Sequence, residues 1–180
     1  MLFFIEHKTF AEKATENRIS DRFKLQKPFS DDSVNRVSRA IELFSKARFS
    51  AQKLKLNKAT LLSWLLFYCR FEKATPPIDY LAFFEGTKTE NRNDGPKQGI
   101  TADSNLYPSY HPSSFERDLL NLFIDRSSLR VSDVSSVVYR DFAIWAIYIS
   151  RGIGEVPKNL NINEVAHIAD TIRARVDLGN

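Results

Sequence analysis

The chain has 180 residues, a formal net charge of +4, and 43% hydrophobic and 12% aromatic residues. This composition is sufficient for a packed core and excludes an intrinsically disordered chain, while the length suits one domain or two small ones. The single cysteine, Cys69, excludes an internal disulfide framework and a cysteine-based zinc site, and it fits a reducing compartment.

Apolar segments are too short for a signal peptide or a membrane span. The N-terminal run MLFFIEHKTF is charged from Glu6 onward, and the apolar-rich residues 137–149 contain Arg140 and Asp141. A bilayer-spanning helix needs about 20 predominantly apolar residues. We therefore expect a soluble, cytoplasmic protein that does not contact the membrane.

Charge is distributed unevenly along the chain. Residues 1–75 hold 15 Lys and Arg against 8 Asp and Glu, whereas residues 76–180 hold 11 against 14. No acidic residue lies between Glu42 and Glu72. A basic first half favours an anionic partner on one face, although a basic segment is often only a solvated surface.

The first confident element is an amphipathic helix that begins at Asp31 or Asp32 as N-cap and ends near Arg48. Its apolar side chains recur at steps of three and four residues, which predicts a single packed face. They are Val34, Val37, Ile41 and Phe44, and the opposite face carries Arg36, Arg39, Glu42 and Lys46.

The middle of the chain changes from helical periodicity to loop composition. We expect a short helix, a tight turn and a longer helix from Lys58 to about Lys73, stopped by the prolines that follow, and then a short helix over 78–84. Residues 86–114 are rich in Gly, Pro, Asn, Ser and Thr, which predicts a long loop or linker. This loop would divide a basic helical subdomain, residues 1–85, from a C-terminal helical subdomain, residues 115–180.

The second half is also predicted to be helical. Residues 115–124 place Phe115, Leu119, Leu122 and Phe123 on one face. The next helix, from about 133 to 151 with Ser132 as cap, is apolar nearly all round toward its end and should form a buried axis. Gly152 and Gly154 end it, and Asn163 can cap a last helix. The predicted fold is therefore mainly α, a multi-helix bundle with a long central loop.

The stretch AQKLKLNKATLLSWL, residues 51–65, has the pattern of two helices joined by a tight turn. Ala51 supplies a small residue where two such helices touch, and Asn57 is the predicted N-cap of the second. The stretch resembles the helix-turn-helix of bacterial regulators and departs from it at Lys55, where that family usually has Gly. The alternative is a pair of core helices that happen to be basic.

The predicted nucleic-acid interface combines cations that neutralise phosphates with hydroxyl groups close to a groove. The cations are Arg36, Arg39, Lys46, Arg48, Lys53, Lys55 and Lys58, and the hydroxyl side chains are Thr60 and Ser63. This hypothesis requires that Lys58, Thr60 and Ser63 face solvent. DNA is favoured over RNA as the ligand.

Residues 119–152 resemble the C-terminal helical module of viral and plasmid primase-helicases. The resemblance lies in a Tyr-x-x-Phe-x-x-Trp run, formed by Tyr139, Phe142 and Trp145, which lines up along one helical face. A buried aromatic stripe explains the same spacing.

No catalytic site, metal site or cofactor is predicted. His7, His111 and His167 are scattered, and the chain has no P-loop, GxSxG or HExxH motif. Tyr107 and Tyr110 lie in the predicted loop, where they could either stack on single-stranded bases or anchor the loop.

We therefore expect a non-enzymatic, nucleic-acid-binding accessory or regulatory protein. The alternative is a non-catalytic helical interaction subunit of a larger complex, and a homodimer is compatible with both. In the alternative, an exposed apolar patch contacts the protein partner. Its predicted members are Trp64, Phe67, Phe71, Phe83 and Phe84.

Overall fold

The computed structural model describes residues 2, 15–50, 56–71, 76–77, 79–92, 112–128 and 133–157. The fold is mainly α, as predicted, and the described part of the chain contains helices without strands. The helices are α2 (Glu16–Lys24), α3 (Asp31–Ser50), α4 (Lys58–Tyr68), α5 (Tyr80–Arg92), α6 (Ser114–Ser128) and α7 (Val134–Ser150).

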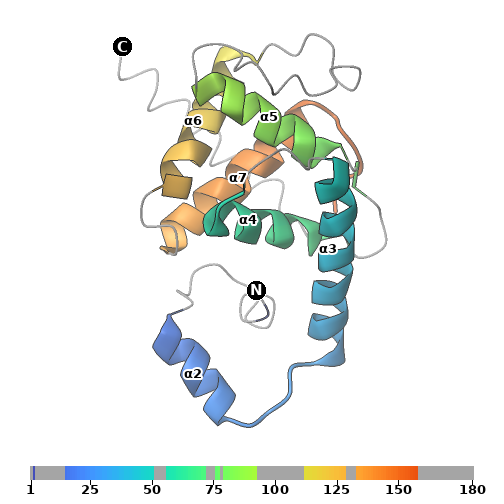
Figure 1. Ribbon diagram of the computed structural model, residues 1–180, viewed down its shortest axis with the longest axis vertical. Coiled ribbons are helices and arrows are strands. Elements are labelled where there is room, and N and C mark those ends of the chain that lie inside the picture. Colours follow the sequence, from blue (N-terminus) through green and yellow to red (C-terminus); the bar gives the residue numbers. More distant parts are fainter. Residues whose placement is uncertain are drawn as a thin grey trace.

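Helices α3 to α7 pack around a common core, and α2 lies apart from them in Figure 1. Helix α7 packs against α4 and α6, α3 packs against α4 and α5, and α5 packs against α6. In the described residues, no helix is both long enough and apolar enough to cross a membrane.

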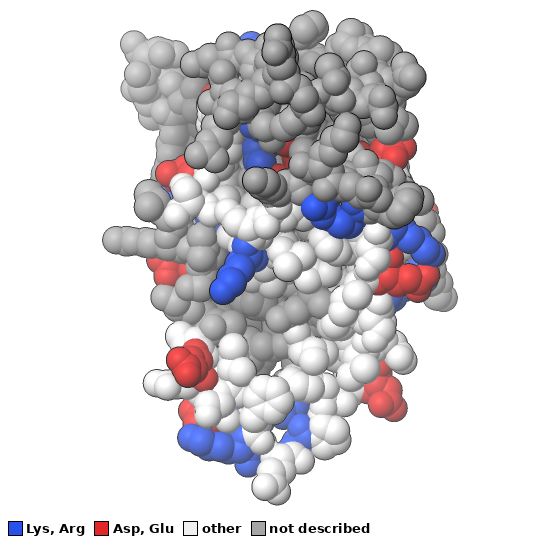
Figure 2. Space-filling view, viewed as in Figure 1, with Lys and Arg blue, Asp and Glu red and all other residues white. Residues whose placement is uncertain are grey.

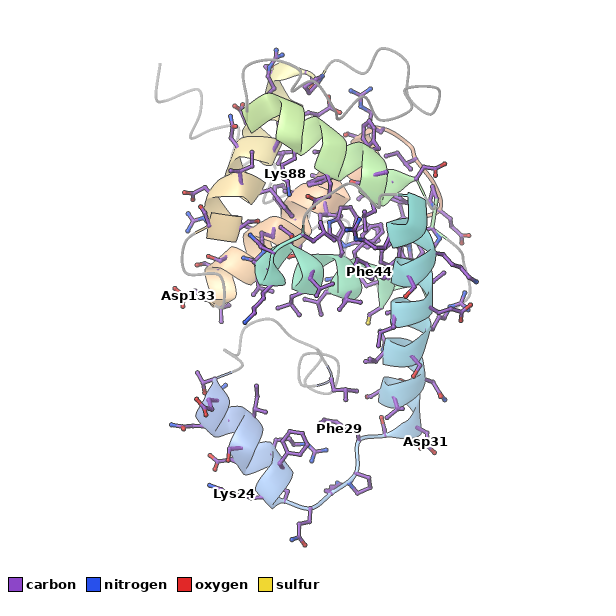
Figure 3. All side chains as sticks on the ribbon, in the orientation of Figure 1. Lys24, Phe29, Asp31, Phe44, Lys88 and Asp133 are labelled. Atoms are coloured by element: carbon purple, nitrogen blue, oxygen red, sulfur yellow. The ribbon has the colours of Figure 1, made fainter. Side chains whose placement is uncertain are left out.

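Helix α2 was not indicated by the apolar periodicity, and none of its residues is buried. Two contacts of Arg22 are local. Arg22 Nη1 donates to the Lys27 carbonyl oxygen at 2.7 Å, and the Arg22 guanidinium lies 4.3 Å from the centre of the Phe29 ring. These contacts join α2 to the segment that leads into α3, where Figure 3 marks Phe29.

Helix α3 begins one residue earlier than the predicted caps allow, because Ser30 rather than Asp31 or Asp32 satisfies its first turn. Ser30 Oγ accepts from the Ser33 backbone N–H at 3.2 Å and donates to Ser33 Oγ at 2.9 Å. The two aspartates lie inside the first turn, where the positive end of the helix dipole favours them.

The predicted packing face of α3 is rotated by about one residue from the observed one. Of the predicted side chains, Val34 and Ile41 are 43% and 49% exposed, Val37 is half-buried and Phe44 packs against the core. The fully buried side chains are Ala40, Leu43 and Ala47. One residue on an α-helix is a rotation of about 100°. The alanines allow close approach of α4 and α5, so this face packs although its side chains are small.

Helix α4 begins at Lys58 with Asn57 as N-cap, as predicted; Asn57 Oδ1 accepts from the Thr60 backbone N–H at 2.9 Å. The helix ends at Tyr68, five residues before the predicted Lys73. The Asn57 side chain also donates from Nδ2 to the Ser127 carbonyl oxygen at 3.1 Å, which joins the start of α4 to the end of α6.

Helix α5 continues to Arg92, so the predicted boundary after residue 85 falls inside a helix. The prediction that residues 86–92 belong to a loop is wrong. Glu85 is 1% exposed, accepts from Trp64 Nε1 at 2.7 Å and pairs with Lys88. Lys88 lies over the Phe123 ring, 5.2 Å from its centre, between α5 and α6 (Figure 3). This buried Glu–Lys pair holds the helix in place beyond residue 85.

Helix α7 is the buried axis that its apolar composition predicted, since every residue from Arg140 to Tyr148 is buried. It ends in a Schellman motif. The Gly152 N–H donates to the Ile149 carbonyl oxygen at 3.0 Å, the Ile153 N–H donates to the Tyr148 carbonyl oxygen at 3.2 Å, and Gly152 has φ = +57°. Residues 158–180, which include the predicted last helix, lie outside the described residues.

Aromatic rings from α4, α5 and α7 form the centre of the core. Phe67 has its ring centre 4.5 Å from that of Trp145 and 5.6 Å from that of Tyr80. All five members of the predicted exposed patch are buried, with at most 8% of their surface exposed. The patch prediction is therefore wrong, because these rings fill the interior. The patch consisted of Trp64, Phe67, Phe71, Phe83 and Phe84.

Candidate nucleic-acid interface

The predicted cations lie on α3, at the start of α4 and in the segment between them. Lys53 and Lys55 lie outside the described residues. The others are Arg36, Arg39, Lys46 and Arg48 on α3, and Lys58 at the first position of α4.

Arg36 and Arg39 are half-buried and face the protein as well as solvent. Arg39 Nε donates to the Phe71 carbonyl oxygen at 3.1 Å, which ties α3 to the end of α4. An Arg36 guanidinium nitrogen lies 3.9 Å from an Asp32 carboxylate oxygen, and 24% of the Arg36 side chain is exposed. Part of the charge of both residues is therefore used within the fold.

Lys46 is exposed and pairs with Glu42 one turn earlier, with Nζ 2.7 Å from the carboxylate oxygen. The hydrogen bond from Lys46 lowers the pKa of Glu42 below its usual value. Such an exposed pair contributes little to stability and exchanges readily for other anions. Arg48, half a turn further along, is half-buried.

Lys58 is exposed at the N-terminus of α4. This end of the helix carries the positive end of the helix dipole, which favours anions. The Asn57 cap already satisfies one of the orphan N–H groups there. Lys58 therefore adds its charge to a helix end whose hydrogen-bonding capacity is partly used.

The expectation that Thr60 and Ser63 face solvent is wrong, because they are 2% and 1% exposed. Thr60 Oγ1 donates to the Asn57 carbonyl oxygen at 3.0 Å, and Ser63 Oγ donates to the Ala59 carbonyl oxygen at 3.1 Å. Both hydroxyl groups are used inside the protein. They cannot contact a groove in this conformation.

Ser63 faces a buried arginine whose structural role was not predicted from the sequence. Arg140 of α7 is 0% exposed; its Nε donates to Ser63 Oγ at 2.9 Å and its Nη1 donates to the Arg126 carbonyl oxygen at 2.5 Å. Burial lowers the pKa of Arg140 to about 10, which still leaves the guanidinium charged at neutral pH. The available signal was the charged pair Arg140–Asp141 within an otherwise apolar helix, since such residues are seldom buried without partners.

Arg70 belongs to the acid-free stretch but is neutralised across the fold. Its two terminal nitrogens donate to the two Asp141 carboxylate oxygens at 2.6 and 2.7 Å. Arg70 also lies over Trp145, 5.7 Å from the ring centre. The pair joins the end of α4 to the middle of α7. The local excess of positive charge is therefore smaller than the sequence alone indicates.

The aromatic run of α7 is mostly interior. Phe142 and Trp145 are 3% and 0% exposed, and Tyr139 is half-buried beneath the Arg126 guanidinium, 5.2 Å from its ring centre. The run therefore packs the core, and its spacing needs no ligand. The tyrosines of the predicted loop, Tyr107 and Tyr110, lie outside the described residues.

Cys69 is buried, as expected for a small hydrophobic residue, and desolvation raises the pKa of its thiol to about 11. Within the described ranges, no three His, Cys, Asp or Glu side chains are grouped so that they could hold a metal ion. His7, His111 and His167 lie outside these ranges.

On the face shown in Figure 2, the Lys and Arg side chains of the described residues are interspersed with Asp and Glu and do not form one continuous basic patch. The arrangement offers separate exposed cations at the end of α3 and at the start of α4. The chain matches no protein-family model, no curated protein and no solved structure.

Proposed function

We propose that this chain is a nucleic-acid-binding accessory protein that contacts phosphates with the cations on either side of the α3–α4 connection. The observation that carries the proposal is the position of exposed Lys46 and Lys58, which lie at the two sides of an acid-free segment containing Lys53 and Lys55. Clustered cations attract a polyanion and release its counterions on binding, and the exposed pair of Lys46 with Glu42 can give way to a phosphate.

The proposal assigns the chain no catalytic step and no cofactor, and DNA remains the favoured ligand. A cytoplasmic location accords with the single reduced cysteine. Arg39 and Arg70 contribute less than the sequence suggests, since Arg39 donates to the Phe71 carbonyl oxygen and Arg70 pairs with Asp141.

The test is a mobility-shift titration against duplex and single-stranded DNA and RNA at two salt concentrations. The triple variant Lys53→Ala/Lys55→Ala/Lys58→Ala should bind more weakly. Its slope in a log–log plot of affinity against salt should be shallower by up to about 2.7 for duplex DNA, because each neutralised phosphate contributes about 0.9.

A matched control removes three cations elsewhere, with Arg18, Lys24 and Lys27 of the α2 region changed to Ala. It has the same net charge as the first variant and should bind like the unmodified chain. Equal binding by the Lys53/Lys55/Lys58 variant and the unmodified chain would refute the proposal.

The second candidate function is a helical interaction subunit, now supported by a different surface. Phe23 and Leu25 are 63% and 68% exposed at the end of α2, and Val34 and Ile41 are exposed on α3. Exposed apolar side chains that lie close together are typical of interaction sites, and Phe23 and Leu25 are two residues apart. Light scattering of the unmodified chain and of a Phe23→Ser/Leu25→Ser variant tests this function, because an assembly formed through this surface should dissociate in the variant.

A further inference from the structure

We infer that the chain forms a homodimer in which α2 of each copy packs against the exposed face of α3 of the other copy. The dimer rests on the second candidate function, whose exposed surface it assigns to a second copy, and it needs no nucleic acid. Within the residues that the structure describes, six large apolar side chains are exposed, and five of them lie on α2, on its C-cap or on α3. Two elements of the same chain therefore present apolar surface that its core does not cover.

Helix α2 has an apolar side that its own chain leaves exposed. Ile19 and Phe23 are one turn apart on this side and are 38% and 63% exposed, and none of the nine residues of α2 is buried. The Phe23 ring meets the Phe29 ring edge-on, with the ring centres 6.2 Å apart. A helix shorter than about 12 residues is marginal in water unless its apolar side packs. Helix α2 therefore gains stability from any surface that covers Ile19 and Phe23.

The outer face of α3 consists of four exposed side chains that recur at steps of four, three and four residues: Val34, Ser38, Ile41 and Ser45. This spacing places them along one side of the helix, opposite the buried Leu43. At 1.5 Å per residue the outer face is about 17 Å long and α2 is about 14 Å long. The small serines alternate with Val34 and Ile41, which leaves gaps where the ridges of a second helix can lie.

The charges of the two elements are complementary. Residues 16–27 hold four Lys and Arg against two Asp and Glu, a net charge of +2. The exposed charged residues of α3 have a net charge of −2, because its three arginines are half-buried; they are Asp31, Asp32, Glu42 and Lys46. In an antiparallel contact, the basic end of α2 lies beside the acidic start of α3, and the two helix dipoles attract each other. Opposite charges also favour the encounter of the two surfaces.

A second copy is the partner that these surfaces fit, because each chain carries both halves of the contact. In its own chain α2 lies apart from α3 to α7 (Figure 1). In a dimer with two-fold symmetry, the contact of α2 with α3 forms twice and covers the exposed apolar sides of both copies. Two contacts of a nine-residue helix bury less surface than a standard protein interface, so we expect a dissociation constant on the order of 10 μM.

Analytical ultracentrifugation above and below this concentration measures the dimer and compares three alanine variants. Phe23→Ala and Ile41→Ala each remove an exposed apolar side chain from one half of the contact, so each should raise the dissociation constant by about tenfold or more. Leu61→Ala is the matched control, because Leu61 is a similarly exposed apolar residue on α4. It should leave the dissociation constant within about twofold of that of the unmodified chain.

Cysteine trapping then tests which elements meet. A chain with Phe23→Cys, mixed with a chain carrying Ser38→Cys and oxidised, should give a disulfide-linked heterodimer in excess of either homodimer, because α2 faces α3 and not a second α2. The native Cys69 is buried and does not compete. Arg117→Cys, at an exposed position of α6, replaces Ser38→Cys in the control and should give little heterodimer with the Phe23→Cys chain.

Three results would overturn the dimer. They are a monomer at every concentration, a dimer unchanged by both Phe23→Ala and Ile41→Ala, and a chain with cysteines at both 23 and 38 that is oxidised within one molecule, which would show that α2 covers its own α3. A monomer would leave the second candidate function open to a different protein partner. Nucleic-acid binding is decided separately, because a mobility-shift titration well below the dissociation constant of the dimer measures the monomer.

Discussion

Replacing Ser63 with alanine tests whether its hydroxyl group supports the fold or contacts a nucleic-acid groove. Ser63 is 1% exposed, and its Oγ accepts from Arg140 Nε at 2.9 Å. Alanine leaves this N–H of a buried guanidinium without its acceptor. A hydrogen bond to a charged group contributes about 1.5–3 kcal/mol, so we expect the free energy of unfolding to fall by about 2 kcal/mol. For a chain of this length, this corresponds to a fall of roughly 4–8 °C in melting temperature.

The assay is urea denaturation followed by tryptophan fluorescence, which reports on the core directly because Trp64 and Trp145 are both buried. Ser45→Ala is the matched control. Ser45 is exposed, and its Oγ donates only within α3, to the Ile41 carbonyl oxygen at 2.7 Å. Its loss should change stability by less than about 0.5 kcal/mol. If Ser63→Ala were as stable as this control but bound DNA more weakly, the buried role of Ser63 would be refuted.

Three further predictions concern other buried contacts. The thiol of Cys69, with its pKa raised to about 11, should resist alkylation at pH 8 in the folded protein and react at once in urea; fast native labelling in a thiol assay would show that it is accessible. The raised pKa of the thiol contributes to the free energy of unfolding below the unfolded-state pKa near 9, and this contribution is lost as the pH rises through 11. Denaturation at pH 8 and at pH 11 measures the difference. Arg151 donates to the Glu116 carboxylate at 2.5 and 2.8 Å, and Glu116→Gln weakens both contacts. This variant should lower the free energy of unfolding by about 1–3 kcal/mol. An unchanged urea midpoint would mean that the pair contributes nothing to stability. Asn57→Ala removes the cap of α4 and the bond to Ser127, so calorimetry should show a loss of about 1–2 kcal/mol, and Asn57→Asp, which keeps the capping oxygen, should lose less.

The elements with strong local signals were predictable from the sequence. Asn57 caps α4 because a side-chain oxygen at that position meets the first free N–H groups, a contact decided by neighbours in sequence. The mainly helical fold and the buried axis of α7 follow in the same way from periodicity and composition. These features need no knowledge of which helix lies beside which.

Features that depend on tertiary packing were not predictable. The packing face of α3 was misassigned because Ala40 and Ala47 carry a weak hydrophobic signal, although small side chains permit the closest helix contact. The exposure of Thr60 and Ser63 was misassigned because a hydroxyl group is polar in sequence whether it meets water or a buried partner. That partner, Arg140, lies 77 residues from Ser63, beyond any local pattern.

The Arg140 contacts also bear on how the molecule can open. A single guanidinium on α7 is shared between the Ser63 hydroxyl group of α4 and a carbonyl oxygen at the end of α6. If either helix detached alone, the buried cation would lose a partner, which adds about 1.5–3 kcal/mol to the free-energy cost of that partial opening. The backbone amides of α4, α6 and α7 should therefore exchange with solvent as one cooperative unit, while those of α2, which has no buried residue, exchange independently.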